Sequence, residues 1–186
     1  MPNYCNYSMC VVGSKENIEE FIRVIKADYN YQTMEFDFDR HMFRVFEAEC
    51  DDIEERFDGR FQTVINGYCA WSVASCMLAH GYYSDCEARY GDNFRGTTLD
   101  MESGRLHLDI EVYSEEGGVC FQEHYVIIDG GIVCDECVDW YEYWVDGYDS
   151  KEEAEEGLDT HFTDEEWANA EDGRICRGGF DWSFEI

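Results

Sequence analysis

The chain has 186 residues, of which 45% are apolar, and its 12 Phe, 5 Trp and 13 Tyr side chains can supply the core of one domain. With 43 acidic against 13 basic residues the formal net charge is −30, which excludes nucleic acid and anionic membranes as direct partners because the field repels both. No run approaches the roughly 18 apolar residues of a membrane span, and residues 1–10 lack the basic and apolar regions of a signal peptide. We therefore expect a cytoplasmic protein whose ten cysteines are reduced thiols.

The first sixty residues predict two strands and two helices. Residues 4–12 are typical of a strand, and Ser14 can cap the helix that follows. The apolar face of this helix is formed by Ile18, Phe21, Ile22 and Ile25. Residues 34–46 alternate apolar and polar side chains on either side of a bend, which predicts a second strand or a hairpin. The acidic residues 47–58 predict a short helix that ends at Gly59.

The middle of the chain predicts a strand, a helix and the centre of a sheet. Residues 61–71 predict the strand, and Ser72 can cap a helix that the polar segment 81–96 interrupts. Residues 97–105 predict one or two further helical turns. The run 106–143 then contains three stretches rich in Val, Ile, Tyr, Phe and Trp, separated by glycine-containing turns. This pattern is typical of antiparallel strands joined by hairpins.

The order strand, helix, strand, strand, helix, strand is the split βαβ arrangement of an α+β, ferredoxin-like antiparallel sheet. A C-terminal β-hairpin within residues 120–144 extends the sheet, and Ser150 and Thr163 can cap two short acidic helices beyond it. We therefore divide the chain into two parts. Residues 1–144 form a ferredoxin-like α+β domain with an added hairpin, and residues 145–186 form an acidic C-terminal extension packed on the same domain.

Three short motifs stand at the ends of predicted elements: Met1-Pro2-Asn3-Tyr4-Cys5-Asn6, Ala70-Trp71-Ser72 and Tyr113-Ser114-Glu115-Glu116-Gly117-Gly118. Together they resemble the YubB-type ferredoxin-like domain family, whose uncharacterised members occur largely on phages and plasmids. The resemblance covers most of residues 1–144. The chain departs from it at Val73-Ala74, where the family usually has prolines, in an insertion at 82–96 and in the acidic tail. The resemblance implies the fold and a mobile-element origin, and it carries no known activity.

A zinc site is the first alternative, because Cys134 and Cys137 have the spacing of a Cys-x-x-Cys pair. A regular strand places these two cysteines on opposite faces of the sheet, so they cannot share one ion. A hairpin turning at 130–131 places His124 opposite Cys137, which leaves open a site formed by these two residues and a third ligand. A second cysteine pair at matching spacing is absent from the sequence. We therefore assign no metal ligand and no cofactor.

Catalytic patterns are also incomplete. His107, Asp109 and Glu111 alternate along one predicted strand and so share a face, as the ligands of a metal-dependent nuclease do. No lysine lies nearby in the sequence, and the field of the protein opposes nucleic acid. A Gly-x-Ser-x-Gly nucleophile motif is absent, and the acids at 146–149 lack the spacing of a calcium-binding EF-hand loop. We predict that the protein is not an enzyme.

The acidic residues themselves are the strongest candidate site. Residues 135–172 hold 16 acidic residues and one basic residue, Lys151. Alternate residues of a strand lie roughly 6.6 to 6.8 Å apart on one face, and helical residues four apart lie about 5 to 6 Å apart, so both elements can present rows of carboxylates. Aromatic side chains among them can act as anchors for a partner protein. The candidate partner-binding residues are Asp135, Asp139, Glu142, Asp146, Asp149, Glu152, Glu153, Glu155, Glu156, Asp164, Glu165, Glu166, Trp144 and Trp167.

We therefore predict a non-enzymatic inhibitor from a phage or other mobile element that mimics nucleic acid. Its carboxylates would occupy the basic groove of a bacterial defence nuclease, with a CRISPR effector as the first expected target and a restriction enzyme as another target of the same mechanism. A net 30 charges match those of about 15 base pairs of DNA. A small metal-dependent enzyme or zinc-stabilised module is the alternative, and a phage protein whose charge serves solubility is the third. Acids spread evenly over every side of the molecule would contradict the mimicry.

Overall fold

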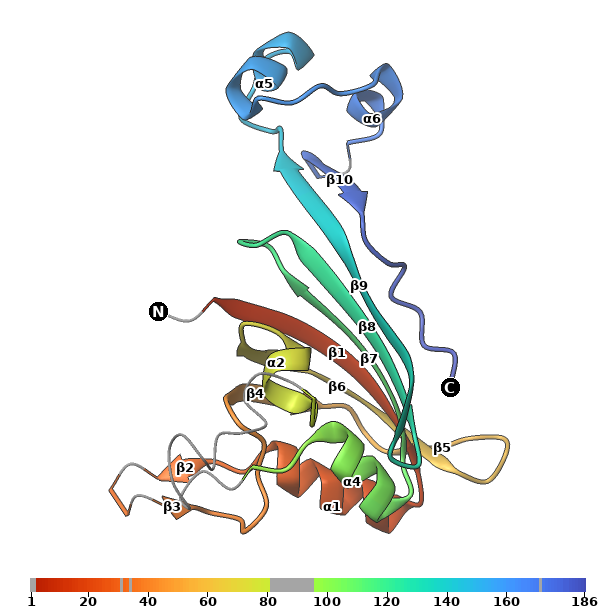
Figure 1. Ribbon diagram of the computed structural model, residues 1–186. Helices are drawn as coiled ribbons and strands as arrows, with labels where there is room; N and C mark the ends of the chain where they lie inside the picture. Colours follow the sequence, from red (N-terminus) through yellow and green to blue (C-terminus); the bar gives the residue numbers. More distant parts are fainter. Residues whose placement is uncertain (1–2, 31, 34, 81–95, 171) are drawn as a thin grey trace.

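The computed structural model describes residues 3–30, 32–33, 35–80, 96–170 and 172–186. The chain is an α+β protein built on one antiparallel sheet with the strand order β10-β9-β8-β7-β1-β6-β4, in which β5 also pairs with β6 (Figure 1). The strands of this sheet are β1 (Tyr4–Gly13), β4 (Val45–Cys50), β5 (Glu54–Glu55), β6 (Phe61–Ala70), β7 (Asp109–Glu116), β8 (Phe121–Ile128), β9 (Gly131–Trp144) and β10 (Arg174–Gly178). A separate pair joins β2 (Tyr29–Asn30) to β3 (Glu35–Phe36). The helices are α1 (Lys15–Ile25), α2 (Val73–Met77), α4 (Leu99–Leu106), α5 (Lys151–Leu158) and α6 (Asp164–Ala168).

The central strand is β1, because it pairs with β6 on one side and with β7 on the other. Its Met9 and Val11 are fully buried in the main core, which lies between the sheet and the helices α1 and α4. The side chain of Ser14 caps α1 by accepting a hydrogen bond from the backbone N–H of Asn17 (3.2 Å). The buried residues of α1 are Ile18, Phe21, Val24 and Ile25. The prediction of a strand followed by an amphipathic helix is confirmed.

The acidic segment 47–58 forms no helix, so this prediction is wrong. The segment belongs instead to β4 and β5, which both pair with β6. Ala48 and Cys50 are half-buried against the core while the glutamates between and before them are exposed, which is the alternation of a strand with one solvent face. Charged side chains on such an edge strand also oppose pairing with a second chain. The segment 34–46, expected as a strand or a hairpin with a bend, contains β3, which pairs with β2, and the start of β4 at Val45, with a bend between them.

We call residues 3–144 the main domain. In its second half the helices and strands follow one another in the predicted order. Ser72 accepts a hydrogen bond from the backbone N–H of Ser75 (3.0 Å) and caps α2, which ends at Met77; most of the interruption expected at 81–96 lies outside the described residues. Thr98 caps α4 in the same way. Four strands, β7-β1-β6-β4, are neighbours in this order, and α1 and α4 cover the same face of them (Figure 1).

The β8–β9 hairpin turns one residue earlier than predicted. Its turn consists of Asp129 and Gly130, which both have positive φ (45° and 85°), as a tight two-residue hairpin turn requires. Val133 is then an extra residue in β9, because Val126 pairs with Cys134 while the next residue, Ile127, pairs with Ile132. The predicted turn at 130–131 is therefore wrong. The earlier turn shifts each partner in β9 by two positions, and the extra residue restores one of them, so that beyond Val133 the cross-strand pairs differ from the prediction by one residue.

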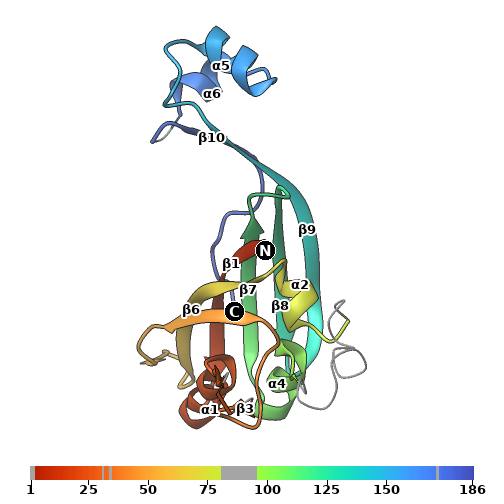
Figure 2. The same ribbon diagram turned by 90° about the vertical axis from the view of Figure 1, so that its left-hand side faces the viewer.

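Beyond the main sheet, β9 and β10 continue as a two-stranded ribbon that carries residues 145–173, which we call the head (Figures 1 and 2). The head encloses an apolar cluster separate from the main core, in which Val145, Ala154 and Phe162 of the head and Ile175 of β10 are buried. We expected residues 145–186 to pack as one extension on the sheet domain. The head instead stands away from the sheet, because α5 and α6 close over a cluster of their own.

Residues 179–186, which we call the tail, return along the face of the sheet opposite the helices (Figure 1). The backbone N–H of Phe180 donates to Gln122 Oε1 (2.7 Å), and the N–H groups of Glu185 and Ile186 donate to Glu111 Oε2 (2.6 and 3.2 Å). The tail therefore covers part of β7 and β8.

In the part of the chain that the structure describes, no helix combines the length and the apolar character that crossing a bilayer demands.

Candidate functional site

The fourteen candidate residues do not form one continuous row. Asp135 and Asp139 project from the core-facing side of β9, because they pair with Tyr125 and Phe121 of β8 and share their face. Glu142 lies on the opposite face of the same strand. The remaining nine acids all belong to the head, so the charge is concentrated there and does not run as a stripe along the ribbon.

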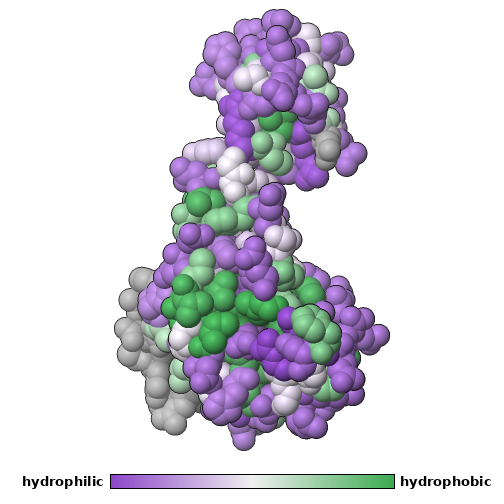
Figure 3. Space-filling view, turned by 90° about the vertical axis from the view of Figure 1, so that its right-hand side faces the viewer, coloured by the Kyte–Doolittle hydropathy of each residue, from purple (hydrophilic) through white to green (hydrophobic). Residues whose placement is uncertain are grey.

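The head is strongly acidic. Residues 145–173 contain 12 acidic residues and one basic residue, a net charge of −11. That basic residue, Lys151, donates to Asp164 (2.7 Å), and Arg177 at the base of the head pairs with Glu166 (2.7 Å). The space-filling view shows the head as a mostly hydrophilic lobe joined to the main domain by a narrow neck (Figure 3). The basic side chains Lys151 and Arg177 are therefore already paired with acids of the head itself.

Several of the candidate acids hold the head together. Glu166 and Thr163 form a capping box at the start of α6, in which each side chain accepts a hydrogen bond from the backbone N–H of the other. The ion pair with Arg177 and the backbone hydrogen bond hold the pKa of Glu166 at about 2. Glu155 accepts a hydrogen bond from the N–H of Phe162 (2.8 Å), and Glu153 accepts one from the N–H of Asp149 (2.9 Å). These carboxylates stabilise the local fold.

The other head candidates face solvent. The side chains of Asp146, Asp149, Glu152, Glu156 and Glu165 are exposed and make no hydrogen bond or ion pair within the described part of the chain. An open hollow beside α5 is lined by Glu152, Glu155, Glu156, Asp159, Thr160 and His161. This grouping gives the head a concave acidic surface, the shape and charge that suit a protruding basic side chain of a partner.

The two candidate tryptophans have different roles. Trp144 lies at the neck with 54% of its surface exposed, and its indole N–H donates to Glu142 (3.0 Å) while Arg174 lies 5.4 Å over its ring. Trp167 is half-buried and packs against Phe162 with the ring centroids 6.3 Å apart. Trp144 is therefore available to a partner, whereas Trp167 belongs to the apolar cluster of the head.

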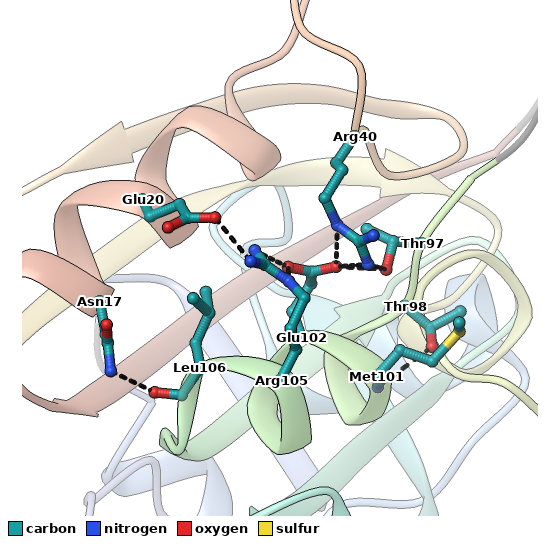
Figure 4. Close-up of polar contacts among 9 residues, drawn as sticks. All are labelled: Asn17, Glu20, Arg40, Thr97, Thr98, Met101, Glu102, Arg105 and Leu106. Carbon is teal, nitrogen blue, oxygen red and sulfur yellow. Dashed lines mark hydrogen bonds and ion pairs between the residues drawn. The ribbon is translucent and has the colours of Figure 1, made fainter.

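A buried carboxylate in the main domain was missed by sequence reasoning, because a glutamate on a short helix gives no burial signal. Glu102 of α4 is fully buried, and its two oxygens accept hydrogen bonds from opposite sides (Figure 4). Arg40 Nε (2.8 Å) and Thr97 Oγ1 (2.5 Å) donate to Oε1, while Arg105 Nη2 (2.6 Å) donates to Oε2. These donors hold the pKa of Glu102 below its usual value despite burial. Since both oxygens are occupied, Glu102 is an anchor for α4 and not a reactive group.

A second buried carboxylate, Glu123, anchors α2 to the sheet. It accepts hydrogen bonds from Ser114 Oγ (2.6 Å) and from the backbone N–H of Val73 (2.9 Å) at the start of the helix. Burial raises the pKa of Glu123. A hollow beside it is also lined by Ser72 and Cys137, but the hydrogen bonds of the Glu123 carboxylate are all made to other groups of the protein. Its role is structural.

The pattern His107, Asp109 and Glu111 does not form a site. His107 lies outside β7, where it ends α4 with a positive φ of 50° and pairs with Asp129 (2.7 Å). Asp109 pairs with Arg60 (2.5 Å), and Glu111 is buried beneath the tail. The expectation that these three side chains share one strand face is therefore wrong, because the strand begins only at Asp109.

Cys134 and Cys137 lie on opposite faces of β9, as predicted. The predicted pair of His124 with Cys137 is wrong, because the earlier turn and the extra residue in β9 together bring Glu136 opposite His124. The same shift places Cys134 beside them, so that one ligand atom from each of His124, Cys134 and Glu136 lies within 4.8 Å of the others. In the described ranges this is the one group of three or more potential metal ligands. Sequence reasoning missed it because it depends on the register of the hairpin.

Comparisons with protein-family models, with curated proteins and with solved structures find no match to this chain. The resemblance to the YubB-type family accordingly stays a prediction. The geometry and the charge of the described residues therefore carry the functional inference alone.

Proposed function

We propose that the protein is a non-enzymatic inhibitor that mimics nucleic acid and acts through its head. The observation that carries the proposal is the net charge of −11 on residues 145–173, displayed on a lobe that stands clear of the sheet. Duplex DNA carries two charges per base pair, so the head matches about five or six base pairs. A lobe of this kind can enter a groove that the main domain cannot.

The target we propose is the basic groove of a bacterial defence nuclease, first of all a CRISPR effector. Such an effector holds its nucleic acids in positively charged channels and reads their backbone. The exposed acids Asp146, Glu152, Glu156 and Glu165 would pair with the lysines and arginines of the channel, and Trp144 at the neck would pack against its rim. A restriction enzyme would be blocked in the same way.

We further propose that the main domain is ferredoxin-like and of mobile-element origin. The order β7-β1-β6-β4, with α1 and α4 on one face, is the arrangement expected for a split βαβ unit. In this account the strands β8 and β9 extend that unit, and the β9–β10 ribbon presents the head. The main domain then serves as the scaffold, and the head as the binding element.

The experiment compares two variants with equal charge and different location. The head variant carries Asp146→Asn, Glu152→Gln, Glu156→Gln and Glu165→Gln. The sheet variant changes four acids of the main domain, on α1, β4, β5 and the loop between β4 and β5: Glu19→Gln, Glu49→Gln, Asp52→Asn and Glu54→Gln. These residues are also exposed and without polar partners among the described residues. Each variant has four fewer negative charges than the native chain. Inhibition of DNA cleavage by a guide-loaded CRISPR nuclease and by a restriction enzyme is the readout.

We expect the head variant to inhibit roughly thirty-fold less well, because four exposed charge pairs at about 0.5 kcal/mol each amount to about 2 kcal/mol. The sheet variant should inhibit as the native protein does. Raising the salt from about 50 mM to about 200 mM should weaken native inhibition, because screening shortens the range of the charges. Equal losses in both variants would show that only net charge matters, and the proposal for the head would then be wrong.

A further inference from the structure

Three side chains of different chemistry meet on the face of the sheet that the tail partly covers. His124 Nδ1 lies 3.6 Å from Cys134 Sγ and 3.8 Å from Glu136 Oε2. The imidazole comes from β8, and the thiol and the carboxylate come from alternate positions of β9, so the register of one hairpin brings all three together. Nitrogen, sulfur and oxygen donors are the set that zinc prefers in proteins.

The two separations that involve His124 Nδ1 are close to those of a tetrahedral ion, and all three ligand atoms lie within 4.8 Å of one another. Zinc bonds of about 2.0–2.1 Å to nitrogen and about 2.3 Å to sulfur place these two atoms about 3.6 Å apart at the tetrahedral angle, which is the separation of His124 Nδ1 and Cys134 Sγ. For nitrogen and a carboxylate oxygen the same geometry requires about 3.4 Å. Rotation of the mostly exposed Glu136 side chain closes the small difference from 3.8 Å.

The imidazole is already oriented for such an ion. Its Nε2 lies 3.0 Å from Oε1 of Glu111, which is 99% buried and is fixed by backbone N–H groups of the tail. With the Nε2–H donated to this carboxylate, the lone pair of Nδ1 points to Cys134 and Glu136. Tyr113 stacks on the ring at 4.2 Å with an interplanar angle of 3°. A carboxylate that orients a ligating histidine is the usual support of a zinc site.

We propose that His124 Nδ1, Cys134 Sγ and a carboxylate oxygen of Glu136 bind one zinc ion, with a water molecule as the fourth ligand. Binding replaces the thiol proton of Cys134, which passes to the solvent, and leaves the thiolate on the metal. The three protein ligands leave one position open, since Glu136 and Cys134 lie at the surface of β9. The site is independent of the head and of its proposed function.

The test uses cobalt as a spectroscopic substitute for zinc, because a cobalt–thiolate bond gives a charge-transfer absorption band in the near ultraviolet. The metal-free protein is titrated with Co²⁺, and zinc bound after dialysis is counted by elemental analysis. The matched variants are Cys134→Ser and Cys137→Ser, two near-isosteric changes in one strand on opposite faces of the sheet. Thermal unfolding of both variants checks that each is folded.

We expect one metal ion per chain and a thiolate band in the native protein and in Cys137→Ser, and neither in Cys134→Ser. Glu111→Gln should weaken the affinity by about 10- to 100-fold, because it removes the carboxylate that orients His124. A native protein without stoichiometric metal would reduce the 3.6 Å contact to a thiol–imidazole hydrogen bond and overturn the proposal. A band that persists in Cys134→Ser, or disappears in Cys137→Ser, would overturn it equally.

Discussion

Replacing Glu102 with glutamine should destabilise the main domain while leaving the head intact. The amide nitrogen of glutamine cannot accept the hydrogen bonds that Arg105 donates to Oε2 through Nε (3.0 Å) and Nη2 (2.6 Å). Each charge-assisted hydrogen bond contributes about 1.5–3 kcal/mol. Arg105 is one-third exposed and keeps its ion pair with Glu20, so its guanidinium recovers part of this loss from water. We therefore expect the free energy of unfolding to fall by about 3 kcal/mol, near the low end of the range.

The assay is thermal and urea unfolding followed by circular dichroism. For a chain of this length about 3 kcal/mol corresponds to a fall in Tm of roughly 6–12 °C. The matched control is Glu20→Gln, which removes the outer partner of the same arginine; since that pair is largely exposed, the change should be below about 1 kcal/mol. A Glu102→Gln protein as stable as the Glu20→Gln protein would refute the role of the buried carboxylate.

The pH dependence gives the same test in another form. The pKa of Glu102 is lowered in the folded protein, so its stabilising contribution is complete above its unfolded pKa and is lost as the pH falls through the folded pKa. Acidification also relieves the self-repulsion of a chain with net charge −30. The difference in stability between native and Glu102→Gln protein removes this common effect. That difference should be constant near neutral pH and should shrink below about pH 4.5.

Two further measurements address the head and the buried histidine. Phe162→Ala should destabilise the head by about 3–5 kcal/mol, because this side chain is 4% exposed at the centre of a small cluster. Amide hydrogen exchange should then become faster in α5 and α6 but not in β1. Faster exchange in β1 as well would contradict the existence of two separate clusters. Burial lowers the pKa of His41 to about 4. The contribution of His41 to stability should therefore fall as the pH falls from about 6.5 to 4, because only the unfolded chain binds the proton easily. A ring titration by NMR with a midpoint near 6.5 would contradict this.

Local signals in the sequence predicted local structure well. Ser14, Ser72, Ser150 and Thr163 each cap the helix that they were expected to cap, because a side chain that accepts a hydrogen bond three residues ahead needs no distant partner. The segment 47–58 failed because pairing with β6 overrode the helical tendency of its glutamates and alanine.

Features that depend on distant contacts were not visible in the sequence. One extra residue, Val133, decides which side chains face His124. The separation of the head depends on whether its apolar residues pack on the sheet or on one another. The net charge calculated from composition treats every acid as if it lay on the surface. Four glutamates are instead buried and hold the fold together: Glu102, Glu111, Glu116 and Glu123. The density of acids in the sequence identified this segment as strongly acidic. It did not show which of these acids lack a hydrogen-bond or ion-pair partner in the fold.

The most direct test of the central proposal asks whether the protein and DNA exclude each other from one groove. Binding of the native protein to a guide-loaded CRISPR nuclease is measured at low salt with increasing concentrations of target duplex. Mimicry predicts that the apparent Kd for the protein rises in proportion to the duplex concentration, and that the head variant binds weakly throughout. A stable complex that holds the nuclease, the duplex and the protein together, with affinity unchanged by DNA, would contradict it.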